Sequence, residues 1–205
     1  MRAEGSAKQT AALLVAGGVI LGSSVVLARP GLVSDREGSV FRILNAGLGP
    51  LERPLWIVMQ AGNGLSSVVV PVVLVTSGRS RADALRAAGA GLGAWQIAKA
   101  VKRLVPRPRP ALLLDEVHLR DGNPGGGGFV SGHAAVSMAT AVVVACGSSR
   151  PVKLGAFSTA LVAGVARIHV GAHLPLDVVG GAALGLIWGS LCTRVPMPEL
   201  KRRRR

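Results

Sequence analysis

Three short polar clusters interrupt an otherwise apolar chain, and each carries residue types that can hold or transfer a phosphoryl group. The clusters are Lys102-Arg103-Leu104-Val105-Pro106-Arg107-Pro108-Arg109-Pro110; Ser131-Gly132-His133; and Arg167 with His173 and Asp177. A phosphoryl group in transfer spreads negative charge over its oxygens, so its chemistry depends largely on fixed positive charge and hydrogen-bond donors. Together the clusters predict a site for a phosphate group.

Three cations and two neutral donors suit the binding of that group. Arg109 and Arg167 can each hold two phosphate oxygens at once, and Lys102 adds a point charge. The Ser131 hydroxyl and the Gly132 backbone N–H can donate further hydrogen bonds, and a glycine lets the backbone approach the ligand closely. Because these cations fill the role that a metal ion has in many phosphatases, we expect no metal and no other cofactor.

In order and internal spacing the clusters resemble the signature of the type 2 phosphatidic acid phosphatase (PAP2) superfamily. That signature is Lys-x6-Arg-Pro, then Pro-Ser-Gly-His, then Ser-Arg-x5-His-x3-Asp. The chain matches it except at two positions, where Val130 replaces the proline and Ala166 replaces the second serine. The resemblance implies an all-α membrane bundle with phosphatase activity, with the motifs at 102–177 inside a single domain of residues 1–205.

The two histidines of the motifs suit different roles in this chemistry. His173 would attack phosphorus to form a phosphohistidine, and Asp177, four residues on, would hold the other ring nitrogen and fix the tautomer. His133 would protonate the leaving oxygen and then activate the water that releases phosphate. Among substrates, the resemblance points to a polyprenyl diphosphate, phosphatidic acid or phosphatidylglycerol phosphate.

Each of these residues also has a structural interpretation when it is taken alone. Asp177 could cap a helix, and an arginine near the end of a membrane span usually extends toward the interface. Arg107 could extend a positive rim or contact lipid headgroups in that way. We interpret His118 as a loop residue and His169 as a packing or supporting residue. The matched spacing across all three clusters favours the catalytic interpretation of the motif residues.

The apolar segments between the clusters must position them, and most are long enough to cross a membrane. Of the 205 residues, 49% are hydrophobic and only 17% are charged. A helix of about 20 apolar residues spans a bilayer, and strand alternation is absent. We predict six transmembrane helices at residues 10–28, 54–76, 83–104, 132–147, 153–171 and 174–193. Glycines such as Gly181 and Gly185 on the sixth would let these helices pack closely.

The net charge of +14 does not indicate a nucleic-acid binder. The charges lie in short clusters between apolar runs and at the two ends, and the chain has no tyrosine, three Phe and three Trp to stack on bases. We therefore expect membrane lipids and a lipid phosphate as partners, and no nucleic acid. The sequence does not indicate an oligomeric state.

Basic residues in the short loops predict the orientation in the membrane. They favour a cytoplasmic location for both ends, including the basic tail at 194–205, and for the loops at 77–86 and 148–153. The loops at 29–53 and 105–131 would then lie outside, and the phosphate site would face outward from what we expect to be a bacterial plasma membrane. In the first outer loop, Ser34 followed by Asp35 and Glu37 predicts a short capped amphipathic helix, either a simple interfacial segment or a lip that guides lipid into the site.

Two other functions share these sequence features. A lipid phosphotransferase would use the same site but pass the phosphoryl group to an acceptor other than water. A non-catalytic scaffold or transporter could use intramembrane charges as a substrate path, but it would distribute them along the membrane depth. Here the charges gather at one end of the spans, which favours the phosphatase.

Overall fold

The computed structural model describes residues 2–28, 31–121 and 125–197, and the regular structure in these ranges is entirely helical. The helices are α1 (Arg2–Leu27), α2 (Asp35–Gly47), η1 (Gly49–Leu51), α3 (Glu52–Met59), η2 (Gln60–Gly62), α4 (Ser66–Thr76), α5 (Arg81–Leu104), η3 (Pro110–Leu112), α6 (Gly132–Ala145), α7 (Arg150–His169) and α8 (Pro175–Cys192). The all-α prediction is confirmed.

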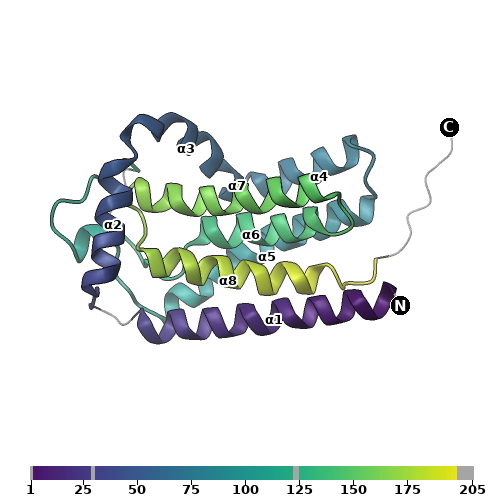
Figure 1. The fold of residues 1–205 in the computed structure, drawn as a ribbon, viewed down its shortest axis with the longest axis horizontal. Coiled ribbons are helices and arrows are strands. Elements are labelled where there is room, and N and C mark those ends of the chain that lie inside the picture. Colours follow the sequence, from purple (N-terminus) through teal and green to yellow (C-terminus); the bar gives the residue numbers. More distant parts are fainter. Residues whose placement is uncertain (1, 29–30, 122–124, 198–205) are drawn as a thin grey trace.

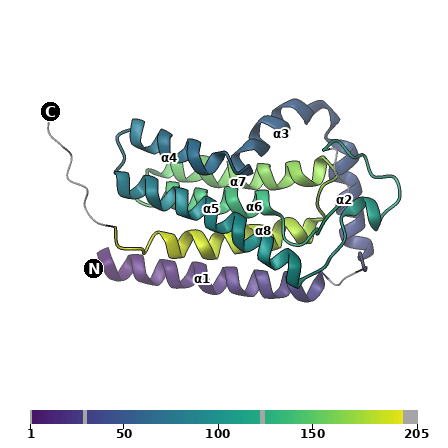
Figure 2. The same ribbon diagram turned by 180° about the vertical axis from the view of Figure 1, so that it is seen from behind.

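The long helices form a bundle around α6, whose residues are nearly all buried. Helices α5, α7 and α8 pack directly against α6, while α1 packs on α8 and α4 packs on α5 (Figures 1 and 2). Helices α2 and α3 lie together at one end of the bundle, and the N-terminus lies at the other (Figure 1). The bundle therefore has two distinct ends, joined by apolar helices.

Serine side chains begin three of the helices. Ser34, Ser80 and Ser131 precede α2, α5 and α6, and each side-chain oxygen accepts a hydrogen bond from the backbone N–H three residues on. Such a cap satisfies one of the N–H groups that the first turn leaves without a partner. The predicted capped helix after Ser34 is confirmed as α2, whereas its role as a lipid-guiding lip stays a prediction.

Glycines on α8 allow it to lie directly against the backbone of α6. A Cβ atom at Gly181 would overlap the carbonyl oxygen of Ser131, and one at Gly185 would overlap that of Ala135. Gly189 meets the carbonyl of Ala139 in the same way one turn further. This four-residue spacing is the small-residue packing typical of membrane helices, and it places the start of α8 beside the start of α6.

The helices that qualify as membrane spans are fewer than the six predicted. Among the described residues, three helices are long and apolar enough to cross a membrane. They are α7, α8 and the Thr10–Leu27 part of α1. The predicted span at 54–76 is two helical pieces that meet at 83°, and counting this broken pair as one span gives up to four. Helix α6 is apolar but shorter, and α5 ends in charged residues, so the six-span count stays a prediction.

Basic residues tie the helix ends together at the end of the bundle that holds the N-terminus. Arg79 donates to Ser148 Oγ at 2.8 Å and to the Cys146 carbonyl at 2.8 Å, which joins the α4–α5 loop to the α6–α7 loop. Arg194 donates to Thr10 Oγ1 and so joins the end of α8 to α1. The residues that suggested a cytoplasmic face thus also hold that face together.

Candidate active site

The three polar clusters meet at the end of the bundle opposite the N-terminus. Lys102 lies in the last turn of α5, Ser131 caps α6, and Arg167 lies in the last turn of α7. Because α5, α7 and α8 all pack against α6, their ends at this side converge. The structure brings six of the predicted residues close enough for their charges to interact: Lys102, Arg109, His133, Arg167, His173 and Asp177.

His173 lies in the turn between α7 and α8, and Asp177 lies in the first turn of α8. Asp177 Oδ2 is 3.6 Å from His173 Nδ1, which is beyond hydrogen-bond distance, and it accepts a hydrogen bond from the Leu174 N–H at 2.9 Å. Asp177 therefore caps α8 and faces His173 at the same time, so the two interpretations of this residue do not exclude each other. With Nδ1 turned toward Asp177, Nε2 is the ring nitrogen that does not face the carboxylate.

The turn that carries His173 is anchored to Arg167. The Ala172 and His173 N–H groups donate to the Arg167 carbonyl at 3.1 and 3.2 Å, and Gly171 makes the turn with a φ of +76°. The His173 side chain is buried. Burial lowers the pKa of His173 to about 4; Lys102 and Arg167 act in the same direction, and Asp177 opposes them. The ring is therefore neutral at neutral pH, as a nucleophile must be.

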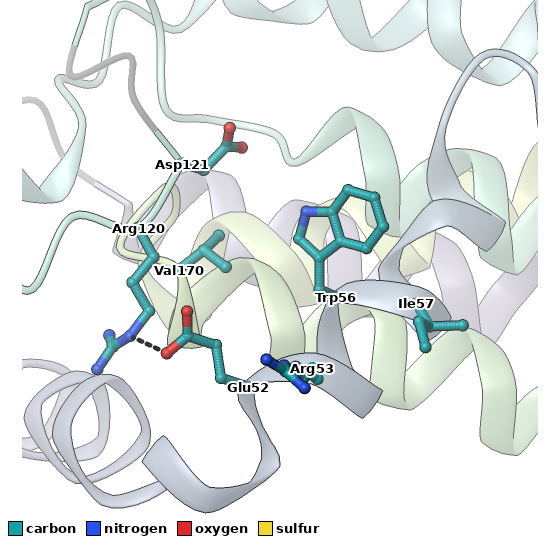
Figure 3. A pocket seen from close by; sticks show the side chains of 7 residues that line it. All are labelled: Glu52, Arg53, Trp56, Ile57, Arg120, Asp121 and Val170. Atoms are coloured by element: carbon teal, nitrogen blue, oxygen red, sulfur yellow. Dashed lines mark ion pairs between the residues drawn. The ribbon is translucent and has the colours of Figure 1, made fainter.

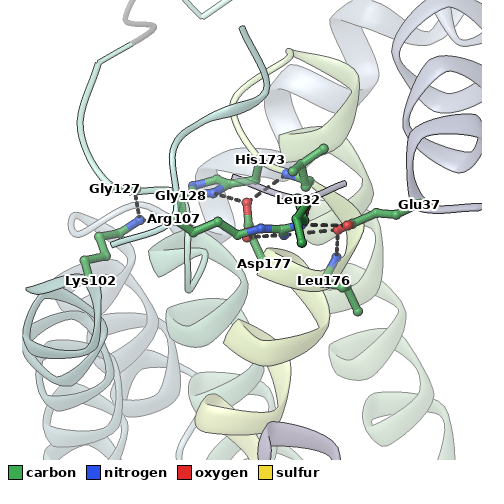
Figure 4. A network of polar contacts seen from close by, with 10 residues as sticks. Leu32, Glu37, Lys102, Arg107, Gly127, Gly128, His173, Leu176 and Asp177 are labelled. Carbon is green, nitrogen blue, oxygen red and sulfur yellow. Dashed lines mark hydrogen bonds and ion pairs between the residues drawn. The ribbon is translucent and has the colours of Figure 1, made fainter. Parts of the chain in front are cut away.

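Lys102 is held by the glycine-rich loop rather than left free over the site. Its Nζ donates to the carbonyls of Gly127 and Gly128 at 2.7 and 3.1 Å (Figure 4). The Gly128 N–H donates in turn to the Arg107 carbonyl at 2.6 Å. In this segment the glycine carbonyls thus hold the Lys102 ammonium group in place.

The two arginines of the motifs, Arg109 and Arg167, lie close enough for their charges to interact. Burial lowers the pKa of Arg109, and the neighbouring charge of Arg167 lowers it further, although Asp121 and Asp177 oppose this. Arg167 is buried, and its Nη1 donates to Asp121 Oδ2 at 2.6 Å. Its Nε has no hydrogen-bond partner among the described residues, so it can donate to a bound oxyanion. Asp121 thus occupies one of the positions where an anion would bind.

Ser131, Gly132 and His133 form the start of α6. The Ser131 hydroxyl accepts a long hydrogen bond of 3.5 Å from the Ala134 N–H. The backbone N–H of Ser131 donates to the Asp177 carbonyl at 2.8 Å. A Cβ on Gly62 would overlap the His133 carbonyl, so η2 lies directly against this helix start. The helix N-terminus adds a partial positive charge to the same end of the bundle.

Two residues that contact the site, Arg107 and Glu37, were not anticipated from the sequence as functional candidates. Arg107 is fully buried and bridges Glu37 and Asp177, with distances of 2.6 Å from Nη2 to Glu37 Oε2 and 2.9 Å from Nη1 to Asp177 Oδ1 (Figure 4). The interpretation of Arg107 as part of a rim or as a headgroup contact is therefore wrong. A signal existed, since Glu37 lies four residues before the apolar Phe41 and so shares the buried face of α2.

The two histidines outside the motifs help to hold α2 against the bundle. His169 is fully buried, its Nδ1 lies 3.1 Å from the Leu44 carbonyl, and its own carbonyl accepts from Asn45 Nδ2 at 2.8 Å. Asn45 also donates to the His118 carbonyl at 2.9 Å and accepts from the His118 N–H. His169 is a packing residue, as expected, and His118 contributes only backbone atoms to these bonds.

A cavity of about 350 Å³ is lined in part by Asp121, the acid that pairs with Arg167 (Figure 3). Its lining residues are Glu52, Arg53, Trp56, Ile57, Arg120, Asp121 and Val170. An ion pair of 3.5 Å between Arg120 and Glu52 lies at one side, and the indole of Trp56 lies at the other (Figure 3). The cavity therefore combines charged groups and an aromatic surface next to a motif arginine.

The two departures from the motif lie in apolar packing. Val130 is fully buried in the main core, and Ala166 is fully buried in a cluster with Leu55 and Met59 of α3. Within the described ranges, no group of three or more His, Cys, Asp or Glu side chains could hold a metal ion.

Comparisons with known proteins agree with this geometry. The family model of the PAP2 superfamily matches residues 84–200. The structure is similar to the crystal structure of Aquifex aeolicus LpxE, with a TM-score of 0.63, 26% identity, and coverage of 77% of this chain and 94% of that one. It also has the fold of a transmembrane PAP2-type phosphatidylglycerolphosphate phosphatase from Bacillus subtilis, with a TM-score of 0.63, 18% identity, and coverage of 90% and 94%. None of the curated protein sequences gives a match.

The family match covers more than half of the chain and includes all three polar clusters. The structural matches extend the likeness to an apolar helical bundle with the proportions of a membrane enzyme. This chain therefore belongs to the PAP2 superfamily and is an integral membrane phosphatase.

Proposed function

We propose that this enzyme removes phosphate from a lipid phosphate or diphosphate by way of a phosphohistidine on His173, without a metal ion. The observation that carries the proposal is the convergence of Lys102, Arg109 and Arg167 with two histidines at one end of the bundle. Three fixed cations in a partly water-excluded site can stabilise the charge that develops on a phosphoryl group in transfer.

The reaction has two steps in this geometry. His173 Nε2 forms a bond to phosphorus while the bond from phosphorus to the leaving oxygen breaks, and His133 gives that oxygen a proton. In the second step His133 takes a proton from water, the water oxygen bonds to phosphorus, and the bond between His173 and phosphorus breaks. Inorganic phosphate leaves, and both histidines return to their first state.

The substrate candidates are a polyprenyl diphosphate, phosphatidic acid and phosphatidylglycerol phosphate. The cavity beside Arg167 supports a headgroup larger than phosphate alone, because Arg53 and Trp56 can contact polar and apolar parts of it. We also propose that the site faces outward from a bacterial plasma membrane and that both termini are cytoplasmic. The support for this orientation is the basic end of the bundle, which lies opposite the site.

Phosphate release from a panel of these lipids by the purified protein in detergent tests the proposal. We expect release from at least one lipid at a rate far above that of a His173→Ala control, and we expect it to persist in excess EDTA. No release above the control from any lipid would refute the phosphatase proposal. Complete loss in EDTA that magnesium restores would refute metal independence, and transfer of phosphate to an added acceptor lipid would identify a phosphotransferase.

A further inference from the structure

A buried ion triad lies directly behind His173, on the side of Asp177. Arg107 lies between two carboxylates: its Nη1 is 3.1 Å from Glu37 Oε1 and 2.9 Å from Asp177 Oδ1, and its Nη2 is 2.6 Å from Glu37 Oε2 (Figure 4). The exposed fractions of the three side chains are 0% for Arg107, 5% for Glu37 and 0% for Asp177. Glu37 lies outside the family's signature motifs, and Arg107 occupies a variable position within the first of them.

Stability alone does not explain such a triad. Removing charges from water costs several kcal/mol per ion, and a buried ion pair is often no more stabilising than apolar side chains of similar size. Here the chain adds further hydrogen bonds to hold the charges: the Leu176 N–H donates to Glu37 Oε1 at 3.0 Å, and the Leu174 N–H donates to Asp177 Oδ2 at 2.9 Å. A role in the chemistry of the neighbouring His173 is the better explanation.

The triad divides the two oxygens of Asp177 between two tasks. Oδ1 is bound by Arg107, while Oδ2 is bound by the Leu174 N–H and faces His173 Nδ1 at 3.6 Å. Contacts on both oxygens fix the plane of the carboxylate. Hydrogen bonds in catalytic sites are often long without substrate and tighten in the reacting complex, so this distance suits a bond that forms during reaction.

The charge count of the triad also fits the proposed reaction. Arg107 alone would neutralise Asp177, but Glu37 adds a second negative charge, so the three side chains together carry one net negative charge. When His173 bonds to phosphorus, its ring gains positive charge. A net negative charge behind the ring stabilises that state, whereas a neutral pair would do so less.

We infer that Glu37 and Arg107 are positioning residues, which hold Asp177 against His173 and keep the charge behind the ring negative. This inference rests on the proposed function, because it assigns the two residues to the same histidine. It also makes α2, which lies outside the matched family segment of residues 84–200, part of the catalytic apparatus.

Three variants distinguish the effects of the triad's net charge, of the orientation of Asp177 and of the packing of α2 against the bundle. Glu37→Gln keeps the shape of the side chain and makes the triad neutral. Glu37→Gln combined with Arg107→Gln restores the net charge of −1 but removes the clamp on Asp177. Asn45→Ala is the matched control: Asn45 is also buried on α2 and anchors the helix through the His118 and His169 carbonyls, away from Asp177.

The measurements are kcat and KM for the most active lipid of the panel, and the inhibition constant of inorganic phosphate. We expect Glu37→Gln and the double variant to lower kcat roughly 10- to 100-fold, as is typical when the partner that orients a functional histidine is lost. KM and the phosphate inhibition constant should change less than about 3-fold, since the phosphate-binding cations are untouched. Asn45→Ala should keep most of the wild-type kcat. An unchanged kcat in Glu37→Gln, or an equal loss in Asn45→Ala, overturns the inference.

A second readout does not require activity, so it distinguishes failure of this inference from failure of the proposed function. The ¹⁵N chemical shifts of selectively labelled histidine report which ring nitrogen of His173 carries the proton. We expect protonated Nδ1 in the wild type and a mixture of tautomers in the double variant. The same single tautomer in both proteins would show that Glu37 and Arg107 do not position Asp177, whatever substrate the enzyme uses.

Discussion

His173 lies in a turn whose backbone is held by the Arg167 carbonyl, and its ring is buried among cations. The same arginine therefore positions His173, the proposed nucleophile, through its main chain, and its side chain carries the charge that we propose for binding phosphate. His133 approaches from the start of α6, on a different element. This arrangement gives the two histidines separate tasks and makes the tasks separable by mutation.

Substitution of the two histidines should affect different substrates differently. His173→Ala should abolish turnover and any covalent phosphoenzyme, because no atom remains to attack phosphorus. His133→Ala should slow release from an alkyl phosphate roughly 100-fold or more but spare an activated aryl phosphate, whose leaving group needs little protonation. Initial rates of phosphate release on both substrates check this. Equal losses for His133→Ala on the two substrates would argue against its role as the acid.

Burial of His173 should appear in the pH dependence of stability. Because burial lowers the pKa of His173 to about 4 from its ordinary value of 6.5, the unfolded chain binds a proton in this window that the folded chain does not. The free energy of unfolding therefore falls as the pH drops from 6.5 toward 4. His173→Asn should reduce the loss of unfolding free energy between about pH 7 and pH 5 by at most about 2 kcal/mol, and the fall in melting temperature over this range should shrink accordingly.

Asp121 should compete with phosphate for Arg167. Its carboxylate lies 2.6 Å from Arg167 Nη1 and is half-exposed, so a bound phosphate must share or displace it. Asp121→Asn should tighten inhibition by inorganic phosphate roughly 3- to 10-fold, the range expected for one partly exposed charge pair. Asp115→Asn changes an exposed acid of the same loop and serves as the control. Weaker inhibition in Asp121→Asn would show that this acid supports binding.

At the scale of elements, the contact between α6 and α8 determines the geometry of the site. Gly181 allows α8 to meet the Ser131 carbonyl, and the Ser131 N–H donates to the Asp177 carbonyl at 2.8 Å. His133 on α6 and Asp177 on α8 are thereby held in one layer. Helix α2 completes this layer from outside the bundle, through Glu37.

A methyl group at this contact should disturb the site. Gly181→Ala places a Cβ against the Ser131 carbonyl and the Ala134 Cβ, so the backbone of α6 must move. We expect a loss of about 1–3 kcal/mol in stability together with reduced phosphate release. Gly155→Ala on α7 meets no atom within 4 Å and should be neutral or slightly stabilising, by up to about 1 kcal/mol. Thermal melting and activity in detergent compare the two; a Gly181→Ala protein that matches Gly155→Ala in both would contradict this assignment.

At the scale of the whole molecule, the protein has a catalytic end and a basic end. Exposed apolar side chains such as Val19, Val72 and Leu161 cover the helices between the two ends, as lipid contact requires. The catalytic end holds α2, α3 and the cavity beside Arg167, while the basic end holds the loops joined by Arg79. Because the two ends differ in their residues, labelling at each end can show which side of the membrane it faces.

Labelling of cysteines in intact cells checks the orientation. Cys146 is native and exposed at the basic end, and Glu116 is exposed in the loop at the catalytic end. A membrane-impermeant maleimide should label Glu116→Cys, in a Cys146→Ser background, without lysis of the cells. It should label Cys146 of the wild type only after lysis. The reverse pattern would place the catalytic end in the cytoplasm.

The sequence by itself determined the motif residues and the helices that carry them, because both depend on short-range order. The spacing of His173 and Asp177, the serine before α2 and the glycines of α8 are local patterns, and their geometry follows from the repeat of a helix. Local patterns also predicted the all-α class and the gathering of charge at one end of the spans. They did not reveal that the segment at 54–76 bends by 83° near η2, where Gly62 lies directly against the carbonyl of His133, a residue distant in the sequence.

Only the tertiary structure decided which charges face each other. Glu37 and Arg107 are 70 positions apart, as are Arg107 and Asp177, and Asp121 is 46 positions from Arg167. The motif spacing selects Arg109, but nothing in the local sequence distinguishes Arg107 from Arg103, which shares its segment. Their different roles arise because α2 and α8 enclose one of these side chains, and a buried cation must then be paired with the acids that surround it.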